Sequence, residues 1–421
     1  MFRLLLCAAI LIATPAAKAY SVLTHEAIID SAWDRYITPL LVKRFPLASS
    51  DDLVHAHAYA YAGAIIQDMG YYPFGSHFFS DLTHYVRSGD FVMNMIAESQ
   101  DLNEYAFALG SMAHYAADTT GHPIATNPAV SIEFPKLRAK YGRLVTYADD
   151  PAAHLKVEFG FDVWQVAKGQ FAPQSYHDFI GFEVSKPVLE RAFRDTYSLD
   201  FPDLFTSVDL ALGTYRYAVS RLIPEMTNVA WNLKKDELRK AHPGLTRRKF
   251  RYNLSRASYH KEWSRQYQKP GTFARILAFL FHLIPKVGPF KAAAFQPPTS
   301  QTITLFEGSF NRTLDQYRDL LLGVGEGRLA LPNRDFDTGA PTRPAEYRLA
   351  DDAFAKLAIE LAGKDPQQVA ATVVKEVLDF YQDLNLPYAT KANSEQWDDT
   401  IKALAHLRTE LASPESSPGT K

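Results

Sequence analysis

Apolar residues recur along most of this chain at the three- and four-residue spacing of helices that bury one face. Alternating runs of β-branched residues, which would predict strands, are scarce. The pattern therefore predicts a mainly α fold. Helical spacing is clearest in residues 102–117, 204–229, 306–321, 354–362, 365–384 and 395–411.

Clusters of glycine, proline and small polar residues interrupt this pattern and predict loops at residues 71–75, 121–128, 296–298 and 331–344. We interpret the last of these as the boundary between two parts of the chain. They are a helical domain at 20–330 and a C-terminal helical extension at 331–412. The remaining residues, 413–421, are rich in Ser, Pro and Gly and are expected to be disordered.

Residues 1–19 have the composition of a secretory signal peptide: Arg3, an apolar run at 4–13, and a small-residue end. The apolar run is too short for a bilayer core of about 30 Å, so we expect cleavage after Ala19 and a secreted or periplasmic protein that begins at Tyr20. The single cysteine, Cys7, lies within this peptide. Burial or bound metal must then stabilise the mature protein, because it has no disulfide.

The charges balance, with 45 Lys and Arg against 47 Asp and Glu, so no global field attracts a polyanion such as nucleic acid. No obligate protein partner is inferred. Residues 234–269 are rich in Lys and Arg, and residues 273–295 are the most apolar stretch after the first nineteen. Two interpretations stay open for them: peripheral contact with an anionic membrane, or a buried helix pair with a solvated charged face.

Histidines and acids gather in the first 160 residues at spacings that suit a metal site. His114 and Asp118 are four residues apart on a predicted helix, so both side chains leave the same face. His154 and Glu158 repeat this spacing. His122 follows at the predicted break, where the chain can turn back toward the same site. A single such pair is more often a surface pair, but two pairs in one region indicate metal binding.

Two further candidates lie upstream, Asp68 and His77. Zinc accepts imidazole and carboxylate ligands when thiolates are absent, which fits this set. After cleavage, the free amine and carbonyl of Tyr20 can also chelate a metal, five residues before His25. A compatible alternative is that Thr24 caps a helix that begins near His25.

These motifs resemble, in type and order, the ligand motifs of the bacterial zinc-dependent phospholipases C, whose distant relatives are single-strand nucleases. The resemblance covers residues 20 to about 165. It implies a multi-helix domain that holds two to three zinc ions. The strings that carry it are Tyr20 to His25, Asp68, Ser76-His77-Phe78-Phe79, His114-Tyr115-Ala116-Ala117-Asp118, His122-Pro123, and His154 to Glu158.

The resemblance implies a ligand set for each zinc. The sets are Asp68, His77, His114 and Asp118 for the first zinc, His122, His154 and Glu158 for the second, and the Tyr20 amine and carbonyl, His25 and a bridging Asp118 for the third.

The sequence also departs from the family pattern. Tyr20 stands where the family has Trp, and the gap from Asp118 to His122 is shorter than in toxin-like members. The gap that follows His122 is longer. His84 is a rival to His77, which we favour because of its neighbours. The C-terminal half is helical, whereas toxin-like members carry a β-sandwich membrane domain there.

The resemblance implies an exported zinc-dependent phosphodiesterase, with hydrolysis of phospholipid head groups by a zinc-activated water. Asp68 is then a ligand that also accepts a proton, or a ligand alone. Two alternatives remain, a single-strand-specific 3′-nuclease and a non-catalytic, metal-stabilised lipid-binding protein. A cysteine or serine nucleophile is excluded, because the mature chain lacks cysteine and a Gly-x-Ser-x-Gly motif. The head group and the choice between C-type and D-type cleavage stay open.

Overall fold

A computed structural model describes residues 22–168, 182–219 and 297–411. These residues are mostly helical, which confirms the mainly α prediction. The described residues contain one isolated β-bridge, between Arg334 and Pro341. Among them, no helix has the length and apolar character needed to cross a bilayer. Four features discussed above lie outside the described residues: the signal peptide with Tyr20, the basic segment 234–269, the apolar segment 273–295, and the tail 413–421.

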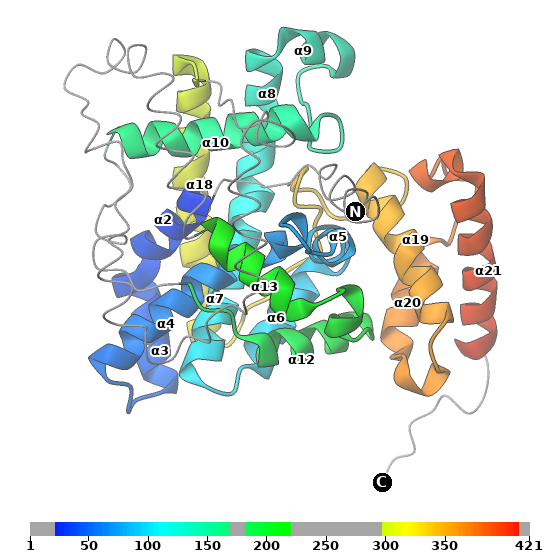
Figure 1. Ribbon diagram of the computed structural model, residues 1–421, viewed down its shortest axis with the longest axis horizontal. Helices are drawn as coiled ribbons and strands as arrows, with labels where there is room; N and C mark the ends of the chain where they lie inside the picture. The colour runs from blue at the N-terminus through cyan, green and yellow to red at the C-terminus, as the bar shows by residue number, and fades with distance from the viewer. Residues whose placement is uncertain (1–21, 169–181, 220–296, 412–421) are drawn as a thin grey trace, which may run out of the picture.

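Within each described range, most helices follow one another with short connections (Figure 1). The α-helices are α2 (Val22–Ala32), α3 (Thr38–Arg44), α4 (Ser50–Gly63), α5 (His77–Tyr85), α6 (Ser88–Glu98), α7 (Leu102–Gly121), α8 (Asn127–Glu133), α9 (Pro135–Tyr141), α10 (Pro151–Lys168), α12 (Lys186–Tyr197), α13 (Val208–Tyr217), α18 (Ser300–Glu326), α19 (Arg348–Ala362), α20 (Ala371–Phe380) and α21 (Ser394–Leu411). The short 3₁₀ and π segments are η1 (Trp33–Ile37), η2 (Ile66–Tyr71), η3 (His122–Thr126), η4 (Phe201–Leu204), η7 (Pro366–Gln368) and η8 (Ala389–Ala392).

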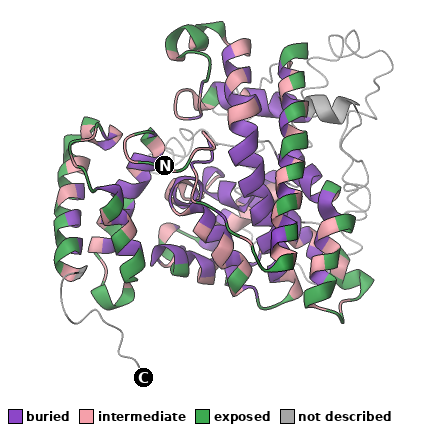
Figure 2. Ribbon diagram, turned by 180° about the vertical axis from the view of Figure 1, so that it is seen from behind, coloured by how far each residue is buried: buried purple, intermediate pink, exposed green. Residues whose placement is uncertain are grey.

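Helix α7 is the centre of the fold and is buried on every side from Glu104 onward (Figure 2). Its composition explains this, because small residues let neighbouring helices approach closely. A Cβ on Gly110 would lie 2.1 Å from the Ala60 carbonyl oxygen, and one on Gly63 would lie 2.0 Å from that of Phe107. Only glycine fits at this crossing, which brings the end of α4 against the middle of α7.

The predicted loop at residues 121–128 is wrong, because the chain there stays helical. A π-helical turn, η3, joins α7 directly to α8, and the Asn127 amide donates to the His122 carbonyl. Pro123 and Pro128 are the second residues of η3 and α8, within the first turn of each segment, where a proline is tolerated best. The break in the sequence pattern is therefore a local widening of one long helix.

The predicted loop at 331–344 is present and returns the chain to the first part of the molecule. The Phe336 amide donates to the His84 carbonyl at 3.2 Å, and the Tyr115 hydroxyl donates to the Pro332 carbonyl at 2.9 Å. Helices α19, α20 and α21 follow as a group, orange to red in Figure 1. Helix α19 packs against α5. Residues beyond 330 thus contact the helices that carry the site.

Candidate metal centre

Histidine and carboxylate side chains converge in the buried interior into three groups, and within each group the ligand atoms lie within 4.8 Å of one another. Every member is buried, and His114 belongs to two groups. Burial of so many ionisable side chains is unfavourable unless they are paired or bind a cation. The groups are His25, His114 and Asp118; Asp68, His84 and His114; and His122, His154 and Glu158.

Asp118 belongs to the first group and also lies next to His84 of the second. Its carboxylate oxygens lie 3.1 Å from Nε2 of His114 and 3.6 Å from Nε2 of both His84 and His25. His84 Nε2 is also 3.4 Å from the carboxylate of Asp68. One carboxylate with three imidazoles around it, and a second carboxylate beside them, has the composition of a shared metal site.

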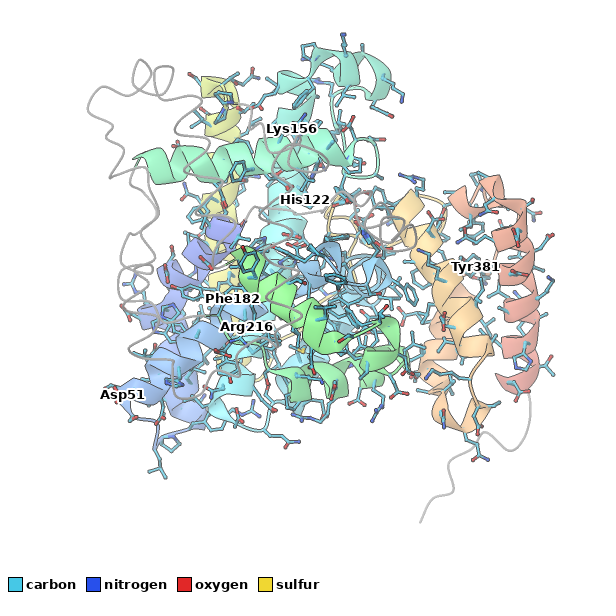
Figure 3. All side chains as sticks on the ribbon, in the orientation of Figure 1. Asp51, His122, Lys156, Phe182, Arg216 and Tyr381 are labelled. Carbon is cyan, nitrogen blue, oxygen red and sulfur yellow. The ribbon has the colours of Figure 1, made fainter. Side chains whose placement is uncertain are left out.

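The third group lies where the end of α7 passes beneath α10, near the labelled His122 and Lys156 in Figure 3. His154 and Glu158 are one turn apart on α10, with Nδ1 of His154 2.9 Å from the Glu158 carboxylate. His122 Nε2 lies 3.5 Å from the same oxygen. Since His114, Asp118 and His122 follow at intervals of four residues, one helix face carries ligands of all three groups.

Hydrogen bonds fix which nitrogen of each ring faces its group. Nδ1 of His114 lies 2.9 Å from the Ala64 carbonyl oxygen, and Nδ1 of His84 lies 2.8 Å from that of Ser80. A carbonyl oxygen only accepts, so these nitrogens carry the proton and Nε2 keeps a lone pair. In His154 the two nitrogens have the opposite roles, because Nε2 lies 2.9 Å from the Asn127 side-chain oxygen and Nδ1 faces the group. Such outer contacts orient metal-binding imidazoles.

Around Asp68, hydrogen bonds connect η2 to α7 and to α5. The Gln67 amide donates to Ser111 of α7, which places the short η2 segment and therefore Asp68. The Ser80 hydroxyl of α5 donates to the Gln67 carbonyl and accepts the Gly70 amide. Because Ser80 also accepts from His84, the same contacts place this histidine.

Helix α2, which carries His25, is held by an acid on α10. The carboxylate of Asp162 accepts the Leu23 amide at 2.9 Å, the Thr24 amide at 3.2 Å and the Thr24 hydroxyl at 2.6 Å. Thr24 therefore lies within the helix and donates to Asp162, so the alternative in which it caps a helix that begins near His25 is wrong. The contacts of Asp162 join the start of α2 to the helix that carries Glu158.

The structure brings His84, and not His77, to Asp68. His77 is the first residue of α5, half-buried, with its ring 5.4 Å from that of Tyr71. His84 lies two turns further along α5 and is buried. Our preference for His77 rested on its neighbours in the sequence, and the geometry favours the rival, His84.

The buried atoms of these groups fit a divalent cation. Both oxygens of Asp68, Asp118 and Glu158 lack an ordinary hydrogen bond among the described residues, although ring nitrogens lie within 4 Å. The same holds for the group-facing nitrogens of His122 and His154. Imidazole and carboxylate ligands without thiolate suit zinc.

The pKa values of two members of the first group, His25 and Asp118, agree with this interpretation. Burial and the neighbouring His114 lower the pKa of His25 to about 3, so this imidazole is neutral, as a ligand must be. Burial alone would raise the pKa of Asp118, but His114 and His84 outweigh it and hold the pKa well below its usual range. Asp118 therefore stays charged in the interior.

One acid was missed by the sequence interpretation. Asp337, in the loop before α19, is buried with an oxygen 3.0 Å from Nδ1 of His122. This contact offsets the effect of burial and lowers the pKa of Asp337. Contacts with Asp337 and Glu158 likewise outweigh burial and raise the pKa of His122 well above its usual value. The available clue was the acidic pair Asp335 and Asp337 between loop-forming residues, but no local spacing linked it to His122.

Asp81 gives a pH-dependent prediction. It lies on α5, 3.8 Å from Lys356 Nζ, and burial raises its pKa to about 6. Between about pH 4 and 6 the folded state thus binds more protons than the unfolded state, so Asp81 makes stability fall as pH rises. Asp81→Asn should remove this slope and raise the free energy of unfolding at pH 8 by roughly 1–3 kcal/mol.

Urea unfolding at pH 4, 6 and 8 measures the effect of Asp81→Asn. The exposed Asp398→Asn is the control and should shift the curves by no more than about 0.5 kcal/mol. Equal destabilisation by Asp81→Asn at all three pH values would contradict the prediction.

Fold and site together define a helical protein with a buried centre of histidine and carboxylate ligands. Residues 24–205 match the family described as zinc dependent phospholipase C. By this match residues 24–205 are similar to the zinc-dependent phospholipase C family, as the sequence motifs suggested. The match extends beyond residue 165 and ends before the loop that carries Asp337. Comparisons with curated proteins and with solved structures gave no match.

Replacing the two α5 histidines separately tests which one binds metal. His84→Ala should lower bound zinc by one ion per chain, because Asp68 and Asp118 lose the imidazole between them. His77→Ala, a matched change on the same helix, should leave the zinc content unchanged. Elemental analysis of both purified variants measures this, and zinc loss in His77→Ala alone would reverse the assignment.

Proposed function

We propose that this protein is a zinc-dependent phosphodiesterase that hydrolyses phospholipids by C-type cleavage. The observation that carries the proposal is the convergence of His25, His84 and His114 on the buried carboxylate of Asp118. The match of residues 24–205 to the zinc-dependent phospholipase C family supports the reaction class and the lipid substrate.

The proposed ligands follow from the groups. Asp68, His84, His114 and Asp118 would hold one zinc, and His122, His154 and Glu158 a second. His25 and Asp118, with the amine of a mature N-terminus at Tyr20, would hold a third. When bound, such ions supply positive charge for the phosphate oxygens and lower the pKa of water toward neutrality.

Asp68 is the proposed proton acceptor. Its two oxygens are buried and accept no ordinary hydrogen bond from the described residues, so lone pairs remain for a proton as well as a ligand bond. His84 Nε2 lies 3.4 Å from one oxygen of Asp68 and 3.6 Å from an oxygen of Asp118. One oxygen of Asp68 would therefore bind the zinc that it shares with His84, which leaves the other oxygen for the proton of the attacking water.

The balanced net charge of the chain also agrees with a phospholipid substrate. Without a global positive field, attraction to phosphate depends on the metal centre itself. We further propose export through the signal peptide at residues 1–19, with cleavage exposing the Tyr20 amine. Sequencing the N-terminus of protein recovered outside the cytoplasm tests this directly, and an intact Met1 start in that protein would contradict it.

The first experiment combines zinc analysis with hydrolysis. Protein beginning at Tyr20 should contain two to three zinc ions and cleave a p-nitrophenyl phosphodiester, and chelation should stop this turnover. Phosphatidylcholine vesicles should then yield diacylglycerol. Phosphatidic acid would instead indicate D-type cleavage, and preferential cleavage of single-stranded DNA would indicate a nuclease. Bound zinc without turnover would favour a lipid-binding protein, and protein that binds no zinc would refute the proposal.

A further inference from the structure

The loop that follows α18 contains a tight turn, and this turn packs against the end of α7. The Asp335 side chain accepts the amides of Asp337 at 2.8 Å and Thr338 at 3.1 Å, which closes the turn. Gly339 has a φ of 69°, and a Cβ there would lie 2.3 Å from the Thr119 carbonyl oxygen. The turn therefore packs against α7 within one helical turn of His122.

Within this turn, the side chain of Asp337 has partners on both oxygens. One oxygen accepts the Tyr85 hydroxyl at 3.0 Å and also the Tyr347 hydroxyl. The other is the oxygen that lies 3.0 Å from Nδ1 of His122. The two tyrosines fix the carboxylate from the side opposite the imidazole, so its direction does not depend on His122 alone.

The backbone of Asp337 is connected through Asn127 to His154, the second histidine of the group with Glu158. The side-chain nitrogen of Asn127 donates to the Asp337 carbonyl at 2.7 Å, and the side-chain oxygen of Asn127 lies 2.9 Å from Nε2 of His154. His122 and His154 are therefore both oriented through Asp337, one directly and one through Asn127. Nδ1 of His154 and Nε2 of His122 both remain near Glu158.

We propose that Asp337 is a positioning residue of the metal centre, whose carboxylate pairs with Nδ1 of His122 at 3.0 Å and so directs Nε2 toward the cation held with His154 and Glu158. The proposal rests on the zinc centre proposed above. His84 and His114 use backbone carbonyls for this purpose, whereas His122 uses a carboxylate. A carboxylate increases the basicity of the imidazole and so its affinity for the metal.

If Asp337 positions His122, the C-terminal part of the chain contributes to the metal centre. The family match ends at residue 205, and Asp337 lies far beyond it. On this proposal residues 331–347 complete the second zinc group, and they are part of the metal centre as well as a connection to α19. The helical extension then acts on zinc affinity through a contact that the family motifs do not contain.

The test measures zinc retention in the full chain. Wild type, Asp337→Asn and Asp337→Ala are titrated with a zinc-competing chelator while zinc per chain and thermal unfolding are recorded. Asp337→Ala should weaken retention of one zinc about 10- to 100-fold, the range for loss of an outer partner of a ligand. Asp337→Asn keeps an acceptor oxygen for Nδ1, so it should recover part of this loss.

A matched control separates positioning from folding. Asp351 is a buried carboxylate in α19 that accepts the amides of Ala345 and Ala389 without contacting a metal group. Asp351→Asn should lower the unfolding temperature but leave zinc retention as in wild type.

Three outcomes would overturn the positioning role: wild-type retention in Asp337→Ala, equal zinc loss in Asp351→Asn, or loss of one whole zinc from Asp337→Asn even in excess zinc. The last would make Asp337 a direct ligand. Failure of the zinc centre itself is distinguishable, because wild-type protein would then bind no zinc at all.

Discussion

Asp118→Asn is expected to release zinc and to reduce phosphodiester hydrolysis by roughly 100- to 1000-fold, the range for loss of one group that stabilises charge in a transition state. The physical reason is the position of this carboxylate within 3.6 Å of three imidazoles. Asparagine has the same shape but no charge, so cations held by His84 and His114 lose their shared anion. Zinc per chain and turnover of a p-nitrophenyl phosphodiester are measured on the same preparation.

Another histidine–carboxylate pair in the chain provides the control. Asp30 lies 3.0 Å from Nε2 of His57 and accepts the Tyr61 hydroxyl, outside the three metal groups. Asp30→Asn should keep the zinc and the turnover of wild type, even where it lowers stability. If Asp118→Asn behaves like Asp30→Asn, then Asp118 does not bridge metal ions.

Removal of zinc should destabilise the fold strongly. Asp68, Asp118 and Glu158 are all buried within the three groups, and loss of the cations would leave their charges to be neutralised by protons alone. An uncompensated buried charge costs about 3–5 kcal/mol. We therefore expect the unfolding temperature to fall by about 5–15 °C after chelation.

Differential scanning calorimetry with and without a chelator measures this change. Added zinc should restore the unfolding temperature. Magnesium should not, because it prefers oxygen ligands to imidazole. An unchanged unfolding temperature in fully chelated protein would show that the groups are stable without metal, contrary to the centre proposed here.

The parts of the site that local spacing controls were predictable from the sequence. His114 with Asp118 and His154 with Glu158 are each one helical turn apart, and the structure brings each pair together. In an α-helix this spacing alone puts two side chains on one face. No knowledge of the tertiary fold was needed for these pairs.

The choice between His77 and His84 could not be made in this way. Seven residues make almost two full helical turns, so both histidines lie on nearly the same face of α5. They differ by about 10 Å along the helix axis. Only the packing of α5 against η2 and α7 decides which end meets Asp68, and that information is tertiary.

Two other features depended on non-local contacts. The glycine and prolines at 121–128 signalled a break, but burial of the surrounding helix and the π-helical turn keep the chain helical. Asp337 lies in a segment without periodicity, so no helix or strand pattern placed it. Its role follows only from the return of residues 331–347 over α5 and α7.

The connection between Asn127 and Asp337 has a consequence for folding. The two residues are 210 positions apart, so their contact closes a very long loop and must overcome its closure entropy. Contacts of such high sequence separation slow folding, because the closure entropy must be overcome before the contact contributes. Since zinc binding and loop closure orient the same two histidines, each should favour the other, and capture of the ion in the second group would then mark the last cooperative step of the folding reaction.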